Sequence, residues 1–159
     1  MDYLLDGYNL LFREVKNPRP LQRTRERILK ALDEEIAEAG LHVTVIFDGS
    51  EKRAVGISSY KLEAVEVVFT SEGLSADDYI LEMLSSAKNP KQKSVITGDR
   101  DLIRKAKRYG AETLDISDFF ALILKKKKKK RAPSSALSFK DTDANIARLL
   151  AIFEENLKN

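Results

Sequence analysis

The sequence contains no cysteine and only one histidine, His42. Without cysteine the chain can form neither disulfides nor thiolate metal sites. A single histidine excludes a two-histidine ribonuclease mechanism, and we expect His42, which precedes a predicted strand, to lie in a surface turn. The sequence also lacks a Gly-rich phosphate loop of the Walker type and a dinucleotide-binding fingerprint. These absences leave carboxylates as the main candidates for chemistry.

Long apolar runs are also missing. No stretch approaches the roughly 18 apolar residues that span a bilayer, and no basic-then-apolar signal segment opens the chain. We therefore expect a soluble, cytoplasmic protein with no membrane partner. A chain of 159 residues with 43% hydrophobic residues suits one compact domain with an appendage.

Negative charge is scarce near the C-terminus. Residues 1–124 carry 18 Lys/Arg against 21 Asp/Glu, whereas residues 125–159 carry 10 against 4, so the net charge of +3 comes entirely from the tail. A basic appendage on an acidic body favours a polyanionic partner, most commonly nucleic acid. Seven consecutive basic residues open the tail: Lys125, Lys126, Lys127, Lys128, Lys129, Lys130 and Arg131. We predict that this run is a low-complexity segment whose self-repulsion disfavours packing, and that it is either a functionless charge run or an RNA anchor.

Short apolar runs alternate with stretches of helical periodicity along the chain. We predict strands at residues 3–5, 43–47, 65–69, 94–97 and 112–114, and helices at 21–39, from 75 to about 89, at 100–109 and at 116–124. Because the strands are apolar throughout, they indicate a parallel sheet covered by helices on both faces. We expect a domain over residues 1–124, a basic run and linker over 125–139, and a C-terminal helix over 140–159.

Three of the predicted strands are followed by an aspartate: Asp6, Asp48 and Asp99. Any one of them is most simply a turn or helix-capping residue, but open parallel sheets bind ligands at the carboxyl ends of their strands. At an effective dielectric near 20, two carboxylates about 4 Å apart repel by roughly 4 kcal/mol, so a convergent set takes up protons or recruits cations. Ligands that are all oxygen select hard ions such as Mg²⁺ or Mn²⁺.

Further candidates flank these strand ends. Ser75 is a predicted helix cap, and Asp77 shares a helical stripe with apolar residues, so we expect Asp77 to point toward the sheet as a ligand and Asp78 to lie on the flank behind it. Asp101, in a first helical turn, either ligates or interacts only with the helix dipole. Asn9 either positions a phosphate or metal-bound water through its amide, or forms a turn.

Four motifs resemble, in order and spacing, the NYN domains of the YacP-like group within the PIN-like nucleases. They are Leu4-Leu5-Asp6-Gly7-Tyr8-Asn9-Leu10, Val45-Ile46-Phe47-Asp48-Gly49, Ser75-Ala76-Asp77-Asp78 and Thr97-Gly98-Asp99-Arg100-Asp101. The resemblance covers about residues 2–124, and the Asp-Gly-Tyr-Asn element is its most specific part.

The resemblance implies a PIN-like three-layer α/β/α sandwich and a metal-dependent endoribonuclease that uses Mg²⁺ or Mn²⁺. Asp6, Asp77 and Asp99 map best onto the catalytic, metal-binding cluster, while Asp48 matches a recurrent position with a less secure role. The implied partners are RNA, including messenger RNA at or near the ribosome, and the ribosome itself.

Two other readings stay open on the sequence alone. One is a non-catalytic RNA- or ribosome-binding module with the same fold, but a pure phosphate binder gains nothing from several carboxylates that face a polyanion. The other is a phosphotransfer receiver-like domain, which also places acids at strand ends. That class needs a lysine after the last strand, where this sequence has Leu114-Asp115-Ile116.

Overall fold

The computed structural model describes residues 1–14, 21–49, 58–131 and residue 151. Helices and strands alternate along nearly all of this part of the chain. In chain order they are β1 (Asp2–Asp6), α1 (Gly7–Glu14), α2 (Leu21–Ala39), β2 (His42–Phe47), β3 (Ser58–Lys61), β4 (Val65–Phe69), α3 (Ala76–Ser86), a 3-10 helix (Pro90–Gln92), β5 (Lys93–Ile96), α4 (Arg100–Arg108), β6 (Glu112–Leu114) and α5 (Ile116–Arg131).

The six strands form one sheet in the order β3-β4-β2-β1-β5-β6. All neighbouring strands run parallel except β3, which pairs antiparallel with β4. The predicted parallel sheet is therefore confirmed. Strand β3 was not predicted, because its sequence, SSYK, is polar and exposed along its whole length.

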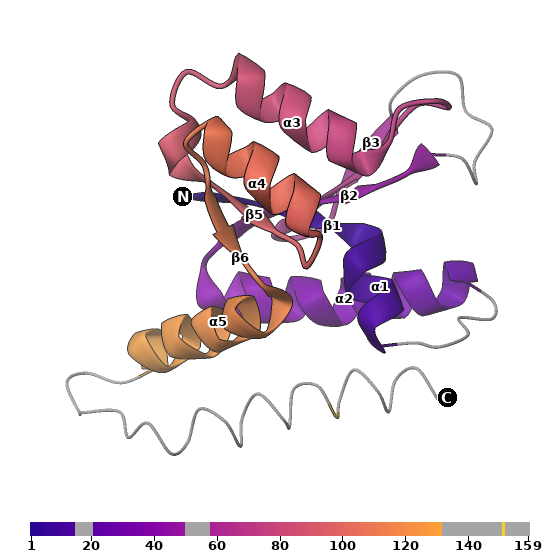
Figure 1. Cartoon of the computed structure of the whole chain (residues 1–159). Coiled ribbons are helices and arrows are strands. Elements are labelled where there is room, and N and C mark those ends of the chain that lie inside the picture. The colour runs from indigo at the N-terminus through magenta and orange to yellow at the C-terminus, as the bar shows by residue number, and fades with distance from the viewer. Residues whose placement is uncertain (15–20, 50–57, 132–150, 152–159) are drawn as a thin grey trace.

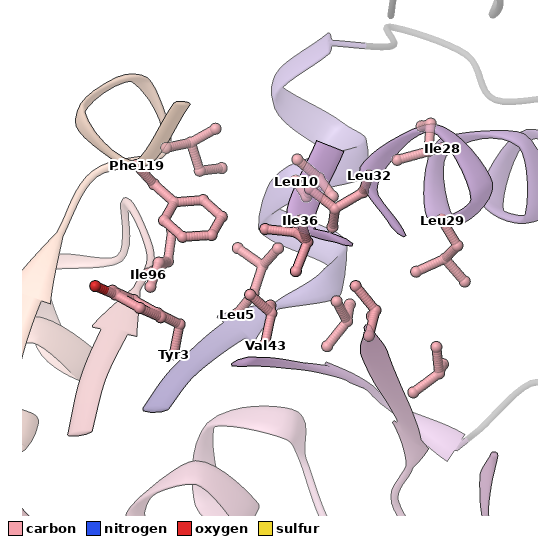
Figure 2. Close-up of a cluster of buried hydrophobic side chains, with 14 of the residues drawn as sticks. Tyr3, Leu5, Leu10, Ile28, Leu29, Leu32, Ile36, Val43, Ile96 and Phe119 are labelled. Atoms are coloured by element: carbon pink, nitrogen blue, oxygen red, sulfur yellow. The ribbon is translucent and has the colours of Figure 1, made fainter. Parts of the chain in front are cut away.

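Helices cover both faces of the sheet, which confirms the three-layer sandwich (Figure 1). Helices α3 and α4 lie on one face, and α1, α2 and α5 lie on the other. Each face has its own core, since successive strand residues point in opposite directions. Leu5 faces α1, α2 and α5, as Figure 2 shows, whereas its neighbour Leu4 packs with Ile80 of α3 and Leu102 of α4.

Glycines end or begin several elements. Gly40 (φ 67°) and Gly110 (φ 86°) close α2 and α4 in the left-handed conformation that glycine tolerates, as their positions predicted. Gly7 begins α1, a helix that the sequence did not predict. A Cβ on Gly7 would lie 2.4 Å from the Phe47 ring, so the chain needs a glycine where α1 leaves β1 and crosses the end of β2.

The basic run is helical, so the predicted end of the last helix at residue 124 is wrong. Helix α5 continues past residue 124 to Arg131. Lys127 Nζ lies 2.5 Å from Glu35 Oε2 and 2.9 Å from Glu38 Oε2 of α2, and Arg131 also pairs with Glu38 at 2.7 Å. The carboxylates of α2 offset the repulsion that was expected to keep the run from packing.

The predicted linker beyond residue 131 and the predicted C-terminal helix lie outside the described residues, apart from residue 151. None of the helices in the described part of the chain is long and apolar enough to cross a bilayer.

Candidate acidic site at the carboxyl edge of the sheet

Asp6 is the last residue of β1, one of the two central strands, and its side chain is buried with 9% of its surface exposed. It receives hydrogen bonds from the backbone N–H groups of Tyr8 and Asn9 in the first turn of α1, the latter at 3.4 Å. Burial raises the pKa of the Asp6 carboxyl, and the charge of Asp99 adds to this; the backbone hydrogen bonds act in the opposite direction. Asp6 is thus both the cap of α1 and part of a charged cluster.

Asp77 lies in the first turn of α3, and its side chain is close enough to interact with that of Asp6. Burial raises the pKa of Asp77 to about 6, with further contributions from the charges of Asp6 and Asp99. Its neighbour Asp78 is exposed, and the backbone N–H of Asp78 donates to the predicted cap, Ser75 Oγ, at 3.0 Å. Helical spacing predicted this separation of the two acids.

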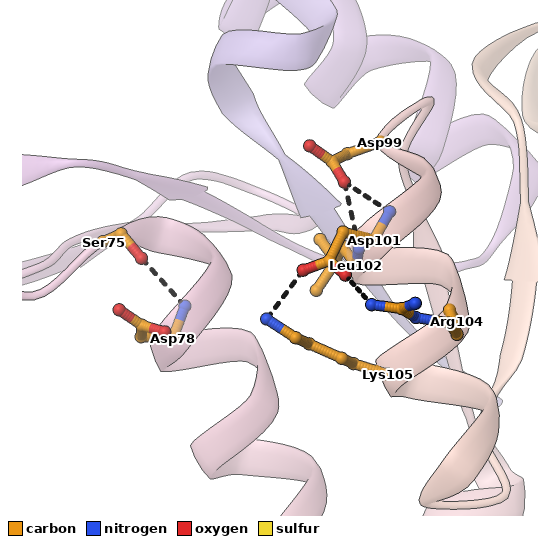
Figure 3. Close-up of polar contacts among 7 residues, drawn as sticks. All are labelled: Ser75, Asp78, Asp99, Asp101, Leu102, Arg104 and Lys105. Carbon is orange, nitrogen blue, oxygen red and sulfur yellow. Dashed lines mark hydrogen bonds and ion pairs between the residues drawn. The ribbon is translucent and has the colours of Figure 1, made fainter.

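Asp99 is the N-cap of α4 and lies three residues after the end of β5 (Figure 3). Its Oδ1 atom accepts hydrogen bonds from the backbone N–H of Asp101 at 2.8 Å and of Leu102 at 3.0 Å, while the other carboxylate oxygen points away from the helix. Asp99 therefore does cap a helix, which is the simplest role of a single aspartate after a strand. The cap also holds the Asp99 carboxylate in place. This carboxylate lies near Asp6 and Asp77, since its charge raises the pKa of both.

Asn9 does not form a turn, because it lies within α1. Its Oδ1 atom instead accepts a hydrogen bond from the backbone N–H of Gly98 at 3.2 Å. This contact joins α1, which starts beside Asp6, to the loop that presents Asp99. The sequence analysis did not predict that Asn9 positions this loop. The available signal was its spacing of three residues from Asp6, which places both residues at the start of one helix.

Asp101 and Asp48 are placed differently from the three central acids. Asp101 is exposed and pairs with Arg104 and with Lys105, the latter at 2.7 Å (Figure 3). The hydrogen bond from Lys105 is the main cause that lowers the pKa of Asp101. Asp48 follows β2, which pairs with β1, and is half-buried at the same edge of the sheet.

The chemistry of the cluster suits a hard divalent cation, since its side chains offer only carboxylate oxygens. Burial is the main cause that raises the pKa values of Asp6 and Asp77, and neighbouring carboxylates add to it, so a bound cation would stabilise their charged forms. Within the described residues, no three acidic or histidine side chains already stand in a metal-ligating arrangement.

Lys105 is a site residue that the sequence analysis missed. Its ammonium lies against Asp101, and its positive charge also acts on Asp77 and is itself affected by Asp78. Its position four residues after Asp101 was the available signal, because helix residues at that spacing lie side by side.

A parallel α/β sandwich with aspartates gathered at the carboxyl edge of its central strands is the architecture of the PIN-like nuclease class. The chain belongs within it to one family, the YacP-like NYN domain, which matches residues 3–156. The resemblance found in the sequence is therefore confirmed. Membership of this family supports a nuclease-type function that involves RNA.

Solved structures support the fold. The chain is similar to the crystal structure of Rae1 (YacP) from Bacillus subtilis, with a TM-score of 0.57 and 23% identity over 99% of this chain and 91% of that chain. A mutant form of the same protein gives a TM-score of 0.60 and 18% identity over 99% of this chain and 97% of that chain. No curated protein matches the chain.

Proposed function

We propose that the protein is a metal-dependent endoribonuclease that hydrolyses RNA phosphodiester bonds. The observation that carries the proposal is the meeting of Asp6, Asp77 and Asp99 at one edge of the sheet, where the charge of Asp99 raises the pKa of Asp6 and the charges of Asp6 and Asp99 raise the pKa of Asp77. A polyanion gains nothing from three carboxylates unless a cation stands between them. The substrate that we propose is single-stranded RNA, including messenger RNA at the ribosome.

Asp6, Asp77 and Asp99 would hold Mg²⁺ or Mn²⁺. When bound, such an ion supplies Lewis-acid chemistry: it activates water and offsets the charge that develops on the phosphate. The chain's own residues fix the geometry. The first turn of α1 orients Asp6, and the first turn of α4 orients Asp99. The hydrogen bond between Asn9 and Gly98 fixes the position of these two turns relative to each other. These supports lie on helices and strands, so little reorganisation is needed when the substrate binds.

Cleavage of a circular single-stranded RNA tests the proposal, because a circle has no ends and only an endonuclease can open it. We expect linear product with Mn²⁺ or Mg²⁺ and none with EDTA. Asp6→Asn, Asp77→Asn and Asp99→Asn should each remove most of the activity in folded protein, and the exposed Asp78→Asn should remove less. RNA binding without cleavage would favour the non-catalytic reading. Undiminished cleavage by all three variants would show that the active site lies elsewhere.

A further inference from the structure

A second feature of the α3–α4 face is a surface pocket that none of the roles above uses. It has a volume of about 420 Å³ and is lined by Leu81 of α3 and by Lys105, Arg108 and Tyr109 of α4 and its end. A volume of this size is within the range of small-molecule binding sites. The lining combines an apolar side chain, an aromatic ring and two cations, which is the combination that binds a base together with its phosphate.

Tyr109 is the aromatic member of this group. It is the C-cap of α4, and 45% of its surface is exposed, which makes it one of few large hydrophobic side chains in the described chain that lie open to solvent. Gly110 ends the helix directly after it with φ 86°, so the backbone at Tyr109 is held by the helix end. An exposed, well-placed aromatic ring is a stacking platform for a nucleobase.

Helix α4, which supplies two of the pocket's lining residues, is strongly positive. Helix α4 carries one acid, Asp101, and five exposed cations: Arg100, Arg104, Lys105, Lys107 and Arg108. Only Arg104 and Lys105 pair with Asp101, and Arg108 makes no ion pair with any other described residue. The pairs on the helix are exposed and therefore weak, so a phosphate can compete for Lys105. The charge of α4 thus fits an anionic ligand.

Lys105 links the pocket to the acidic site. It lines the pocket, and its charge also acts on Asp77 at the edge of the sheet. Figure 3 shows its side chain extended between α4 and α3 toward Asp101, which is two residues after Asp99. Arg108 lies nine residues after Asp99 along α4, about 14 Å at a rise of 1.5 Å per residue. An RNA strand with one phosphate at the acidic cluster can therefore place a nucleotide further along the same strand in the pocket.

We infer that the pocket of Leu81, Lys105, Arg108 and Tyr109 binds one nucleotide of single-stranded RNA, at a position further along the strand from the cleaved phosphate. The base stacks on Tyr109 over Leu81, and its phosphate contacts Arg108 and Lys105. The placement of this nucleotide on the same strand as the cleaved phosphate rests on the proposed function. The binding itself does not, and it can be measured without any cleavage.

The test uses a short single-stranded RNA with one 2-aminopurine, whose fluorescence falls when the base stacks on an aromatic ring, in buffer with EDTA. We expect the parent protein to bind and quench the probe. Tyr109→Leu should weaken binding by about fivefold or more, the lower end of what base stacking contributes, and abolish the quenching. Tyr109→Phe, which keeps the ring, should retain both.

Charge variants on the same helix complete the test. Arg108→Gln should weaken binding and flatten the dependence of log affinity on log salt by about 0.7, the value for one phosphate contact with a single strand. Lys107→Gln removes the same charge from the adjacent position, which does not line the pocket, and should change both quantities much less.

Several outcomes would overturn the inference: no binding by the parent, parental binding and quenching by Tyr109→Leu, or equal effects of Arg108→Gln and Lys107→Gln. An oligoglutamate peptide that binds as tightly as RNA and depends on Arg108 but not on Tyr109 would identify an acidic protein segment as the occupant instead. Because the assay contains no divalent metal, a failure of cleavage leaves its result intact.

Discussion

The side-chain oxygen of Asn9 accepts a hydrogen bond from the backbone N–H of Gly98 at 3.2 Å. Gly98 immediately precedes Asp99, and Asn9 lies three residues after Asp6, so this single bond spans the two strand ends that carry the central acids. Asn9 is positioned by α1, and Asp99, the residue after Gly98, is positioned by the first turn of α4. The bond therefore fixes the relative position of two groups that we propose act on one metal ion.

We predict that Asn9→Ala lowers the single-turnover cleavage rate by about tenfold to a hundredfold, because a misplacement of about 1 Å can cost that much. Asn9 is a positioning residue in this view, so RNA affinity in EDTA should stay within about twofold of the parent. The rate at saturating RNA and the affinity are measured separately. A loss of affinity with an unchanged rate would instead mean that Asn9 contacts the RNA.

A second prediction concerns stability without metal. The pKa of Asp77 is raised from 3.8 to about 6 in the folded protein, mainly by burial and then by Asp6 and Asp99. Its folded pKa thus lies above the unfolded value, so the folded state binds more protons between these values and loses stability as the pH rises from about 4 to 6. Asp77→Asn should remove this loss, and should be more stable than the parent at pH 7.5 in EDTA.

The difference between Asp77→Asn and the parent should shrink as the pH falls and vanish below about pH 4, where Asp77 is protonated in both states. Urea unfolding midpoints at several pH values measure it. Asp78→Asn is the control, because this neighbouring side chain is exposed and contributes less to the raised pKa of Asp77 than burial, Asp6 and Asp99, so it should give a much smaller stabilisation. A stability difference that does not depend on pH would contradict the electrostatic explanation.

We predict that Mg²⁺ or Mn²⁺ raises the melting temperature by binding to the folded state. At a hundred times its Kd, a ligand adds about 2.7 kcal/mol to the free energy of unfolding. The double variant Asp6→Asn/Asp99→Asn should lose this stabilisation, whereas Asp101→Asn should keep it, because Asp101 is occupied by Arg104 and Lys105. Equal stabilisation of the parent and the double variant would show that the metal binds at another place.

The sequence predicted the buried part of the fold well. Strands β1, β2, β4 and β5 are apolar because both faces of the central sheet are covered, and this pattern is local and visible. Strand β3 escaped detection since it is a polar edge strand held by its pairing with β4. Helix α1 escaped because an Asp-Gly pair is a common strand stop, whereas here Gly7 is small enough to pass the Phe47 ring.

In the candidate site, too, local sequence patterns predicted some features and missed those that depend on distant partners. Strand ends and helical spacing predicted that Asp6, Asp77 and Asp99 would meet, because parallel strands end at one edge. Asn9 and Gly98 are separated by 89 positions in the sequence, and Lys127 and Glu35 by 92. No local sequence pattern predicts contacts between residues so far apart. Partners this distant decide what a side chain does in the fold, and only the three-dimensional structure supplies them.

The basic end of α5 lies away from the acidic site. Lys130 approaches Gly40, with its Nζ atom 2.6 Å from where a Cβ there would stand, and Gly40 precedes β2. The first residue of β2 pairs with Asp2, at the opposite end of β1 from Asp6. Lys127 forms ion pairs with Glu35 and Glu38. Burial favours a lower pKa for Lys127, but the two glutamates together have the larger effect, so its pKa is raised.

The last prediction follows from the difference between the paired Lys127 and the exposed lysines of the same run. Lys125, Lys126 and Lys129 are exposed, so their triple replacement by glutamine should weaken RNA binding at low salt and flatten the log–log salt slope by about 0.7 for each lost phosphate contact. The cleavage rate at saturating RNA should not change, since residues so far from the acids supply only uniform binding. Lys127→Gln is the matched control: it breaks the contacts with α2, and should lower the melting temperature while it leaves RNA affinity near the parent's. A triple variant with the parent's affinity and slope would show that the run serves the packing of α5 alone, and a fall in its saturated rate would contradict the separation of the two regions.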